Sequence, residues 1–267
     1  MDKEPYMILF DSHCHIDDKA YEKDLEAVID RAGKENVRGM MIVGIDIPTS
    51  LKAVKIAGAH PHIITSVGIH PHDADQCSRD TLNTLLRLAK ENPCVKAWGE
   101  TGLDYNRMFS PVKDQESCFA AQLEIAGSLD LPLIFHERDS EGRFYEILKS
   151  AGPKSRKGVV HCFSGTREEL FKYLDLGYYI GITGIVTIDK RGEYLRGLVP
   201  HIPEERLLIE TDAPYLTPAP QKNKFRRNEP AFVKSVLLKL AEIKKTDPDM
   251  LSRVIFNNTK KLYQIDF

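Results

Sequence analysis

The chain has 267 residues, with 37 basic and 39 acidic side chains and a formal net charge of −2. This balance excludes nucleic-acid binding through overall basicity, so any such contact must depend on a local patch. Five cysteines without a C-x-x-C spacing exclude a disulfide framework or a zinc finger. No apolar run approaches the roughly 18 residues of a membrane span, and residues 1–5 do not read as a signal peptide. We therefore expect a reduced, cytoplasmic protein, or a nuclear one in a eukaryote.

Eight short apolar segments alternate along the chain with stretches whose apolar residues recur every three or four positions. The segments predict strands at Met7–His15, Arg38–Ile45, Ile63–Pro71, Val95–Gly102, Leu131–Glu137, Gly158–Ser164, Tyr178–Gly184 and Leu207–Pro214. Eight strand-then-helix units in this length predict an α/β protein, a single (β/α)₈ TIM-barrel domain over residues 1–267. An open doubly wound sheet is the alternative, although no G-x-G-x-x-G motif follows a predicted strand.

Six side chains of metal-ligand type close the predicted strands: His13 and His15 on the first, Glu100 on the fourth, His136 on the fifth, His161 on the sixth and Asp212 on the eighth. The C-terminal strand ends of a barrel form one rim, which carries the active site in barrel enzymes. Taken alone, the His-x-His pair is equally consistent with two hydrogen-bonded histidines. Together, the six side chains predict a site for two divalent cations at this rim.

The position of each predicted strand around the barrel suggests a role for its carboxylate. The fourth strand lies between the first strand and the fifth and sixth, so we expect Glu100 to bridge the two cations. Asp212 comes from the eighth strand, beside the first, and could bind one cation and accept the proton of the attacking water.

Side-chain alternation along the strands argues against a cysteine nucleophile. Alternation places Asp11 inside the barrel with the first two histidines, and Cys14 outside it. The same rule puts Cys162 outside, so both cysteines are expected to be small packing residues. A serine nucleophile of the G-x-S-x-G type is also excluded, because that motif does not occur.

Around these side chains the sequence carries a set of longer motifs. In chain order they are Asp11-Ser12-His13-Cys14-His15, Gly68-Ile69-His70-Pro71-His72, Gly99-Glu100-Thr101-Gly102-Leu103-Asp104-Tyr105, Pro132–His136, His161-Cys162-Phe163-Ser164-Gly165, Glu210-Thr211-Asp212-Ala213-Pro214-Tyr215-Leu216 and Arg227-Asn228-Glu229-Pro230. Together, in this order and over nearly the whole chain, they resemble the TatD family of metal-dependent deoxyribonucleases.

The resemblance implies a TIM barrel of the amidohydrolase-like group with 3′-to-5′ exonuclease activity on single-stranded DNA, and RNA as a further substrate. It assigns His13, His15 and Asp212 to one cation, His136 and His161 to the other, and Glu100 to both. It favours Mg²⁺ in function, with Zn²⁺ or Mn²⁺ as alternatives that suit mixed nitrogen and oxygen ligands. It implies neither a membrane nor an obligate protein partner.

A basic loop over residues 220–227 follows the eighth predicted strand and is expected to lie over the rim. Arg226 and Arg227 would there contact phosphates, and Phe225 would stack on a base. The alternative is a solvated loop whose charges have no particular role. His70, at the end of the third predicted strand, is expected to contact the substrate.

Two other functions share most of these features. A metal-dependent amidohydrolase or phosphotriesterase would use the same ligands on a small molecule, and a panel of substrates would identify it. A non-catalytic barrel could bind a partner through its rim, but a binding module has no use for six intact ligands.

Overall fold

The computed structural model describes residues 7–151 and 157–266. Within them, eight parallel strands form one sheet in chain order. The strands are β1 (Leu9–Cys14), β2 (Val37–Val43), β3 (Ile63–Val67), β4 (Val95–Asp104), β5 (Leu133–Arg138), β6 (Gly158–Val160), β7 (Tyr179–Ile182) and β8 (Leu207–Ile209). A parallel bridge between Cys14 and Ala213 joins the two outer strands just beyond β8. The predicted (β/α)₈ barrel is therefore confirmed.

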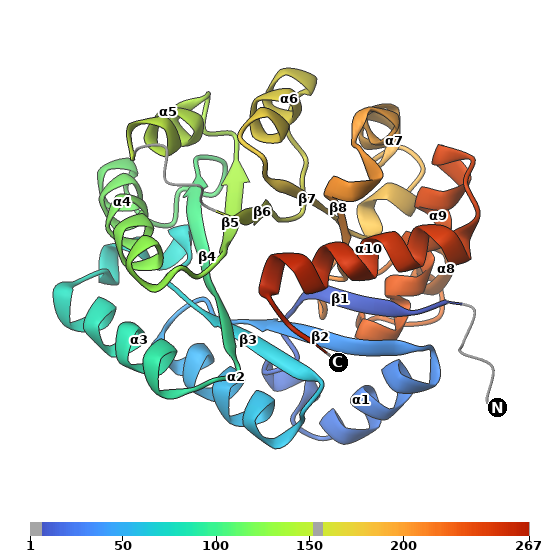
Figure 1. Ribbon diagram of the computed structural model, residues 1–267, viewed down its shortest axis with the longest axis horizontal. Coiled ribbons are helices and arrows are strands. Elements are labelled where there is room, and N and C mark those ends of the chain that lie inside the picture. The colour runs from blue at the N-terminus through green and yellow to red at the C-terminus, as the bar shows by residue number, and fades with distance from the viewer. Residues whose placement is uncertain (1–6, 152–156, 267) are drawn as a thin grey trace.

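Helices surround this ring of strands, as Figure 1 shows. The α-helices are α1 (Leu25–Lys34), α2 (Ile47–Ala59), α3 (Arg79–Glu91), α4 (Val112–Leu129), α5 (Arg143–Ser150), α6 (Arg167–Asp175), α7 (Glu193–Leu198), α8 (Ala219–Lys222), α9 (Val233–Lys244) and α10 (Pro248–Tyr263). Short 3₁₀ turns lie between them: η1 (Lys19–Tyr21), η2 (Pro71–Gln76), η3 (Gly184–Thr187), η4 (Val199–His201), η5 (Glu204–Arg206) and η6 (Pro230–Phe232).

The apolar side chains form two layers, because successive residues of a strand point to opposite faces of the sheet. One layer lies between the strands and the surrounding helices. The other fills the barrel, with Phe10 from β1 and Ile64 from β3 packed against Phe256, Leu262 and neighbouring residues at the end of α10. This inner cluster draws mainly on the first halves of the strands. The C-terminal helix thus closes one end of the barrel and leaves the opposite rim for the site.

None of the helices in the described residues is long and apolar enough to cross a membrane. The expectation that residues 1–5 are not a signal peptide falls outside the described residues.

Candidate active site

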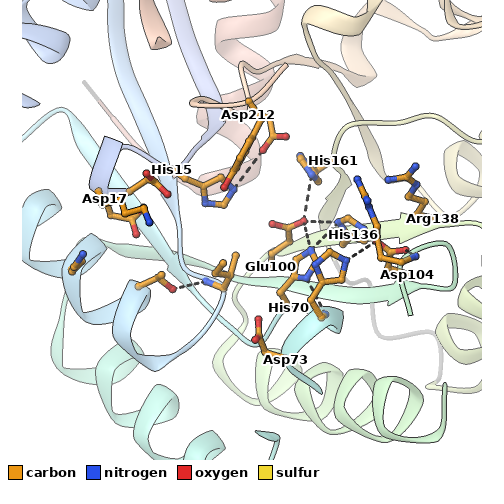
Figure 2. Close-up of a pocket in the computed structure, with 18 residues that line it drawn as sticks. His15, Asp17, His70, Asp73, Glu100, Asp104, His136, Arg138, His161 and Asp212 are labelled. Atoms are coloured by element: carbon orange, nitrogen blue, oxygen red, sulfur yellow. Dashed lines mark hydrogen bonds and ion pairs between the residues drawn. The ribbon is translucent and has the colours of Figure 1, made fainter. Parts of the chain in front are cut away.

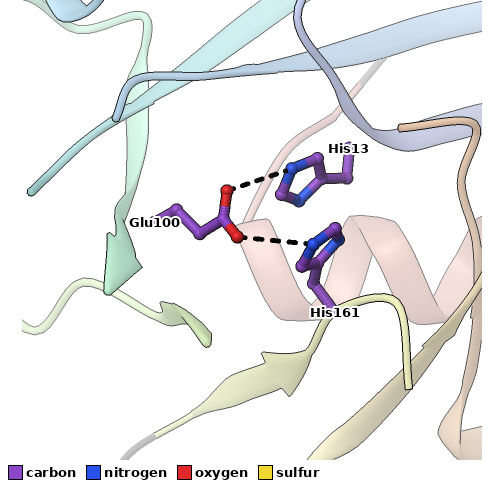
Figure 3. A group of neighbouring side chains, drawn as sticks. All are labelled: His13, Glu100 and His161. Carbon is purple, nitrogen blue, oxygen red and sulfur yellow. Dashed lines mark ion pairs between the residues drawn. The ribbon is translucent and has the colours of Figure 1, made fainter. Parts of the chain in front are cut away.

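Glu100, in β4, lies at the centre of a group of buried histidines on the rim. One carboxylate oxygen, Oε1, is 2.8 Å from His136 Nδ1, 3.3 Å from His161 Nε2 and 3.4 Å from His70 Nε2. The other, Oε2, is 3.5 Å from His13 Nε2. Figure 3 shows the carboxylate reaching both His13 and His161, whose rings are stacked with their centroids 3.7 Å apart. One carboxylate therefore contacts imidazoles from four strand ends.

Asp212 completes the cluster from the segment after β8. Its Oδ1 is 3.5 Å from His15 Nε2 and 3.7 Å from His13 Nε2, and these two nitrogens are 3.2 Å apart. Figure 2 shows His15 and Asp212 together on one side of Glu100, with His136 on the other. All six residues predicted as ligands are thus brought to one place.

Potential ligand atoms within 4.8 Å of one another form three groups in the described residues: His13, Glu100 and His161; His13, His15 and Asp212; and His70, Glu100 and His136. His70 was predicted only as a substrate contact. The structure places it close enough to Glu100 to be a further candidate ligand. That these side chains bind metal remains a prediction.

Two glycines allow β4 to pass close enough to β5 for this contact. Gly99 and Gly102 have φ angles of +147° and +149°, which side chains rarely permit. A Cβ at Gly102 would overlap the carbonyl oxygen of His136, and one at Gly99 would lie 2.5 Å from that of Ile134. The glycines flanking Glu100 therefore bring its carboxylate against His136.

The side chains of strand β1 do not follow simple alternation along the whole strand. Phe10 lies in the interior cluster, although alternation counted from His13 and His15 would have placed its side chain outside the barrel. The pairing of β1 with β2 shifts register between Asp11 and Cys14. This irregularity lets His13 reach the rim although Phe10 also points inward. Asp11 accepts a hydrogen bond from Thr211 N at 2.8 Å, beyond β8. Cys14 packs in the outer layer as predicted.

Outer hydrogen bonds orient three of the rim histidines. His15 Nδ1 donates to the carbonyl oxygen of Val43 at 3.0 Å, and His161 Nδ1 donates to Glu210 Oε1 at 3.1 Å. In both rings Nε2 is then the nitrogen that faces the cluster. Such outer acceptors typically fix the tautomer of a metal-binding histidine. The donor set therefore fits divalent cations.

The carboxylate of Asp104 orients His136 in the same way, and this role was not predicted from the sequence. Its Oδ2 is 3.2 Å from His136 Nε2 and 2.8 Å from His72 Nε2, so His136 Nδ1 faces Glu100. Strand alternation could have found it, because Glu100, Gly102 and Asp104 share one face of β4.

Burial and charge set the protonation of the cluster. Burial, aided by His161, lowers the pKa of His13, so this imidazole is neutral with a free lone pair. Burial opposes ionisation of Glu100 and Asp212, but the surrounding histidines outweigh it and lower the pKa of both carboxyls. Burial also disfavours protonated His15, yet its hydrogen bond to Asp212 raises that pKa to about 9. Ionised carboxylates are the form that metal binding requires, and a bound cation would displace the proton of His15.

The basic loop does not lie where the sequence suggested. Neither Arg226 nor Arg227 lines either of the two cavities at the rim. The Arg227 guanidinium donates to Asp24 Oδ2 at 2.7 Å and to Glu229 Oε1 at 2.9 Å, and Arg226 is exposed. Phe225 packs beside Phe232, with ring centroids 5.1 Å apart. A substrate contact by this loop remains a prediction, and Arg227 would have to exchange its partners to make one.

A family model described as TatD related DNase matches residues 10–264. The chain belongs to this family. Among its relatives, a protein named 3'-5' ssDNA/RNA exonuclease TatD from Pantoea ananatis (strain LMG 20103) is 42% identical over 258 residues, which cover 96% of this chain and 99% of the relative. As a member of the TatD-related DNase family, the chain is a metal-dependent hydrolase of phosphodiester bonds.

Solved structures show the same barrel. The TatD homologue YJJV from Escherichia coli K12 superposes with a TM-score of 0.89 at 27% identity, covering 98% of this chain and all (100%) of that one. The phosphotriesterase homology protein from Escherichia coli has a TM-score of 0.63 at 15% identity, with 98% and 100% coverage. This second similarity shows a shared fold.

Proposed function

We propose that the chain is a divalent-metal-dependent 3′-to-5′ exonuclease acting on single-stranded DNA, with RNA as a second substrate. The observation that carries this proposal is the convergence of four histidines and Asp212 around Glu100. The convergence occurs in a chain that is 42% identical to a relative named 3'-5' ssDNA/RNA exonuclease TatD.

In this proposal His13, His15 and Asp212 hold one cation, His136 and His161 hold another, and Glu100 contacts both. The two oxygens of Glu100 support this division, since Oε2 faces His13 while Oε1 faces His136 and His161. His70 is a further candidate on the Oε1 side. Mg²⁺ is the proposed cation in function, with Zn²⁺ or Mn²⁺ as alternatives.

Bound divalent cations would supply positive charge to the reacting phosphate and lower the pKa of the attacking water. Asp212 is the proposed acceptor of that water's proton. Its lowered pKa keeps it ionised, and 16% of its side chain remains exposed, so a water can reach it. Glu100 is almost fully buried beneath the histidines, which suits a structural carboxylate better than a proton acceptor.

The chain is also proposed to form one domain, because the described strands and α10 build a single barrel. The cytoplasm is the proposed compartment. All five cysteines are free, as expected in a reducing environment.

The test is hydrolysis of a single-stranded DNA labelled at its 5′ end or at its 3′ end, with Mg²⁺, Mn²⁺ or Zn²⁺ supplied in turn. A 3′-to-5′ exonuclease releases labelled mononucleotide at once from the 3′-labelled strand and shortens the 5′-labelled strand stepwise. The Glu100→Gln variant is the matched control and should be inactive with every metal. Activity that persists in a chelator, or cleavage only at internal positions, would overturn the proposal.

A further inference from the structure

The rim opens into two adjoining cavities that share the catalytic cluster. A cavity of about 550 Å³ extends toward β1 and β3, and a second of about 630 Å³ extends toward the segments that follow β5 to β8. Both are lined by His136, His161 and Asp212. A substrate that spans the cluster would therefore occupy both.

The second cavity, which we call the arginine arm, is lined by Arg191 and, on the wall that it shares with the first cavity, by Arg107 and Arg138. Glu137 and Asp139 also line it, and their carboxylates accept hydrogen bonds from Ser140 and Asn106. In the part of the chain that the structure describes, none of these guanidinium groups has a carboxylate within 4.0 Å. Other arginines do: Arg143 pairs with Glu116 at 2.8 Å, and Arg227 pairs with Asp24 at 2.7 Å. Unpaired guanidinium groups beside a hydrolytic site are ready to bind phosphate.

An exposed aromatic ring lies in the same arm. Tyr194, at the start of α7, is 59% exposed, and its hydroxyl accepts a hydrogen bond from Arg167 N at 3.2 Å. This bond restrains the ring although one face is open to solvent. Tyr215, on the wall that the two cavities share, is 56% exposed. Exposed aromatic rings beside arginines are the elements with which proteins bind single strands.

The first cavity has a different character beyond the cluster. Away from the wall that carries Arg107 and Arg138, it is lined by Asp17, Asp18 and Asp73, together with the exposed Lys19 and Lys52. Asp17 is buried, and its Oδ1 has no hydrogen-bond partner among the described residues. Figure 2 shows Asp17 on the side of Glu100 away from Arg138, with Asp73 below Glu100 in the same view. The three aspartates disfavour a chain of phosphates at the Asp17 end of the first cavity, whereas Arg138 on the shared wall and Arg191 in the arm favour one on the other side of the cluster.

We propose that the arginine arm binds the remaining strand, on the 5′ side of the bond being hydrolysed, while the terminal nucleoside lies toward Asp17. Arg138 and Arg191 contact phosphates of the strand, and the Tyr194 ring stacks on one of its bases. This inference rests on the proposed function, because only removal from the 3′ end makes the 5′ side the remaining strand.

Binding of a fluorescein-labelled octathymidylate in EDTA tests the arm without hydrolysis. Arg191→Ala should weaken binding and lower the slope of log Kd against log[salt] by about 0.7, the value for one phosphate contact on a single strand. Tyr194→Ala should weaken binding about fivefold or more, and Tyr194→Phe should keep the wild-type Kd because the ring remains. Arg87→Ala, an equal loss of charge at an exposed arginine of α3 outside both cavities, is the control.

Hydrolysis in Mg²⁺ then compares the octanucleotide with a dinucleotide, which leaves no second phosphate for the arm. Arg191→Ala should raise KM for the octanucleotide several-fold more than KM for the dinucleotide. Unchanged Kd and salt slope in both Arg191→Ala and Tyr194→Ala would overturn the arm, whether or not the protein cleaves DNA. Binding that responds to both variants as expected, without cleavage in any metal, would instead overturn the proposed function and the 5′-side assignment, and would leave the arm as a binding surface for single strands.

Discussion

Asp212 sits in a backbone conformation that few side chains adopt. Its φ angle is +54°, in the left-handed region, where asparagine and aspartate are the most readily accepted residues after glycine. Asparagine is therefore the substitution that removes the charge of Asp212 without disturbing the turn after β8. Alanine would confound a loss of chemistry with backbone strain.

Asp212→Asn should fold normally, bind single-stranded DNA nearly as well as the wild type, and lose turnover by about two orders of magnitude or more. The reason is that the amide cannot accept the proton of the attacking water. Measuring kcat and the melting temperature on the same preparation checks this. A variant with full kcat would remove Asp212 from the mechanism, and lost stability with normal specific activity would make it a packing residue.

Asp104→Asn should weaken metal binding about 10- to 100-fold, the usual cost of losing an outer partner of a ligand histidine. Both oxygens of Asp104 accept hydrogen bonds, Oδ2 from the two histidines and Oδ1 from Asn106 N and Arg107 N. An amide has a single acceptor oxygen and cannot satisfy both sets, so the His136 ring loses its fixed orientation. Competition with a chromogenic chelator measures the affinity. Asp189→Asn, which lines neither rim cavity, is the control. Equal affinity in wild type and Asp104→Asn would contradict the positioning role.

Individual residues also show which parts of the site could be predicted from the sequence and which could not. Residue type and strand order were enough to assemble the six rim side chains. Alternation could have added Asp104, but not the correct direction of Phe10, because a register shift in β1 depends on its pairing with β2. His161 and Asp212 lie beyond β6 and β8, where the two-residue period no longer applies.

At the scale of elements, the close approach of β4 to β5 depends on glycine. Gly102→Ala should lower the free energy of unfolding by at least about 2–3 kcal/mol, because its Cβ would overlap the His136 carbonyl oxygen. Gly58→Ala is the matched control. Gly58 lies within α2 and a Cβ there meets nothing within 4 Å, so alanine should stabilise by about 0.5–1 kcal/mol. Urea unfolding measures both, and a neutral Gly102→Ala would contradict the packing argument.

The segment between α8 and η6 is tied to α1 by charge rather than by apolar contacts. Arg227 bonds to Asp24 and Glu229, and Arg31 bonds to Glu229 with Nε–Oε2 at 2.7 Å. The Arg227 guanidinium also lies over the Tyr21 ring, 4.4 Å from its centroid. These ion pairs hold the loop of residues 220–227, which was predicted to bind phosphates, at the side of the barrel. Ion pairs between distant segments have no periodic signal in a sequence.

The same network predicts a dependence on acid pH. The hydrogen bond from Arg227 lowers the pKa of Asp24 from 3.8 to about 2. A lowered folded-state pKa contributes stability above pH 3.8 that is lost as the pH falls toward 2. Asp24→Asn should therefore melt slightly below the wild type at pH 5, by the equivalent of at most about 1 kcal/mol, with the difference closing near pH 2. Asp30→Asn, at an exposed pair with Lys34, is the control, and a gap that persists at pH 2 would contradict the assignment.

In the whole molecule, the apolar cluster that α10 completes and the cluster of candidate ligands lie at opposite ends of the barrel. Leu262 is buried in the interior cluster that α10 completes. Leu262→Ala should cost about 2–5 kcal/mol of unfolding free energy and leave kcat unchanged at temperatures where the protein stays folded. Urea unfolding and a kcat measurement at low temperature check the two halves of this expectation. A large fall in kcat would show that the two ends are coupled.

The order of the elements along the chain has a consequence for synthesis. All eight strands are synthesised before α10. Until that helix is made, nothing in it can cover Phe10, Ile64 and their neighbours inside the barrel. Apolar surface exposed in this way is prone to aggregation. The interior cluster can therefore be completed only after the last described helix has been synthesised.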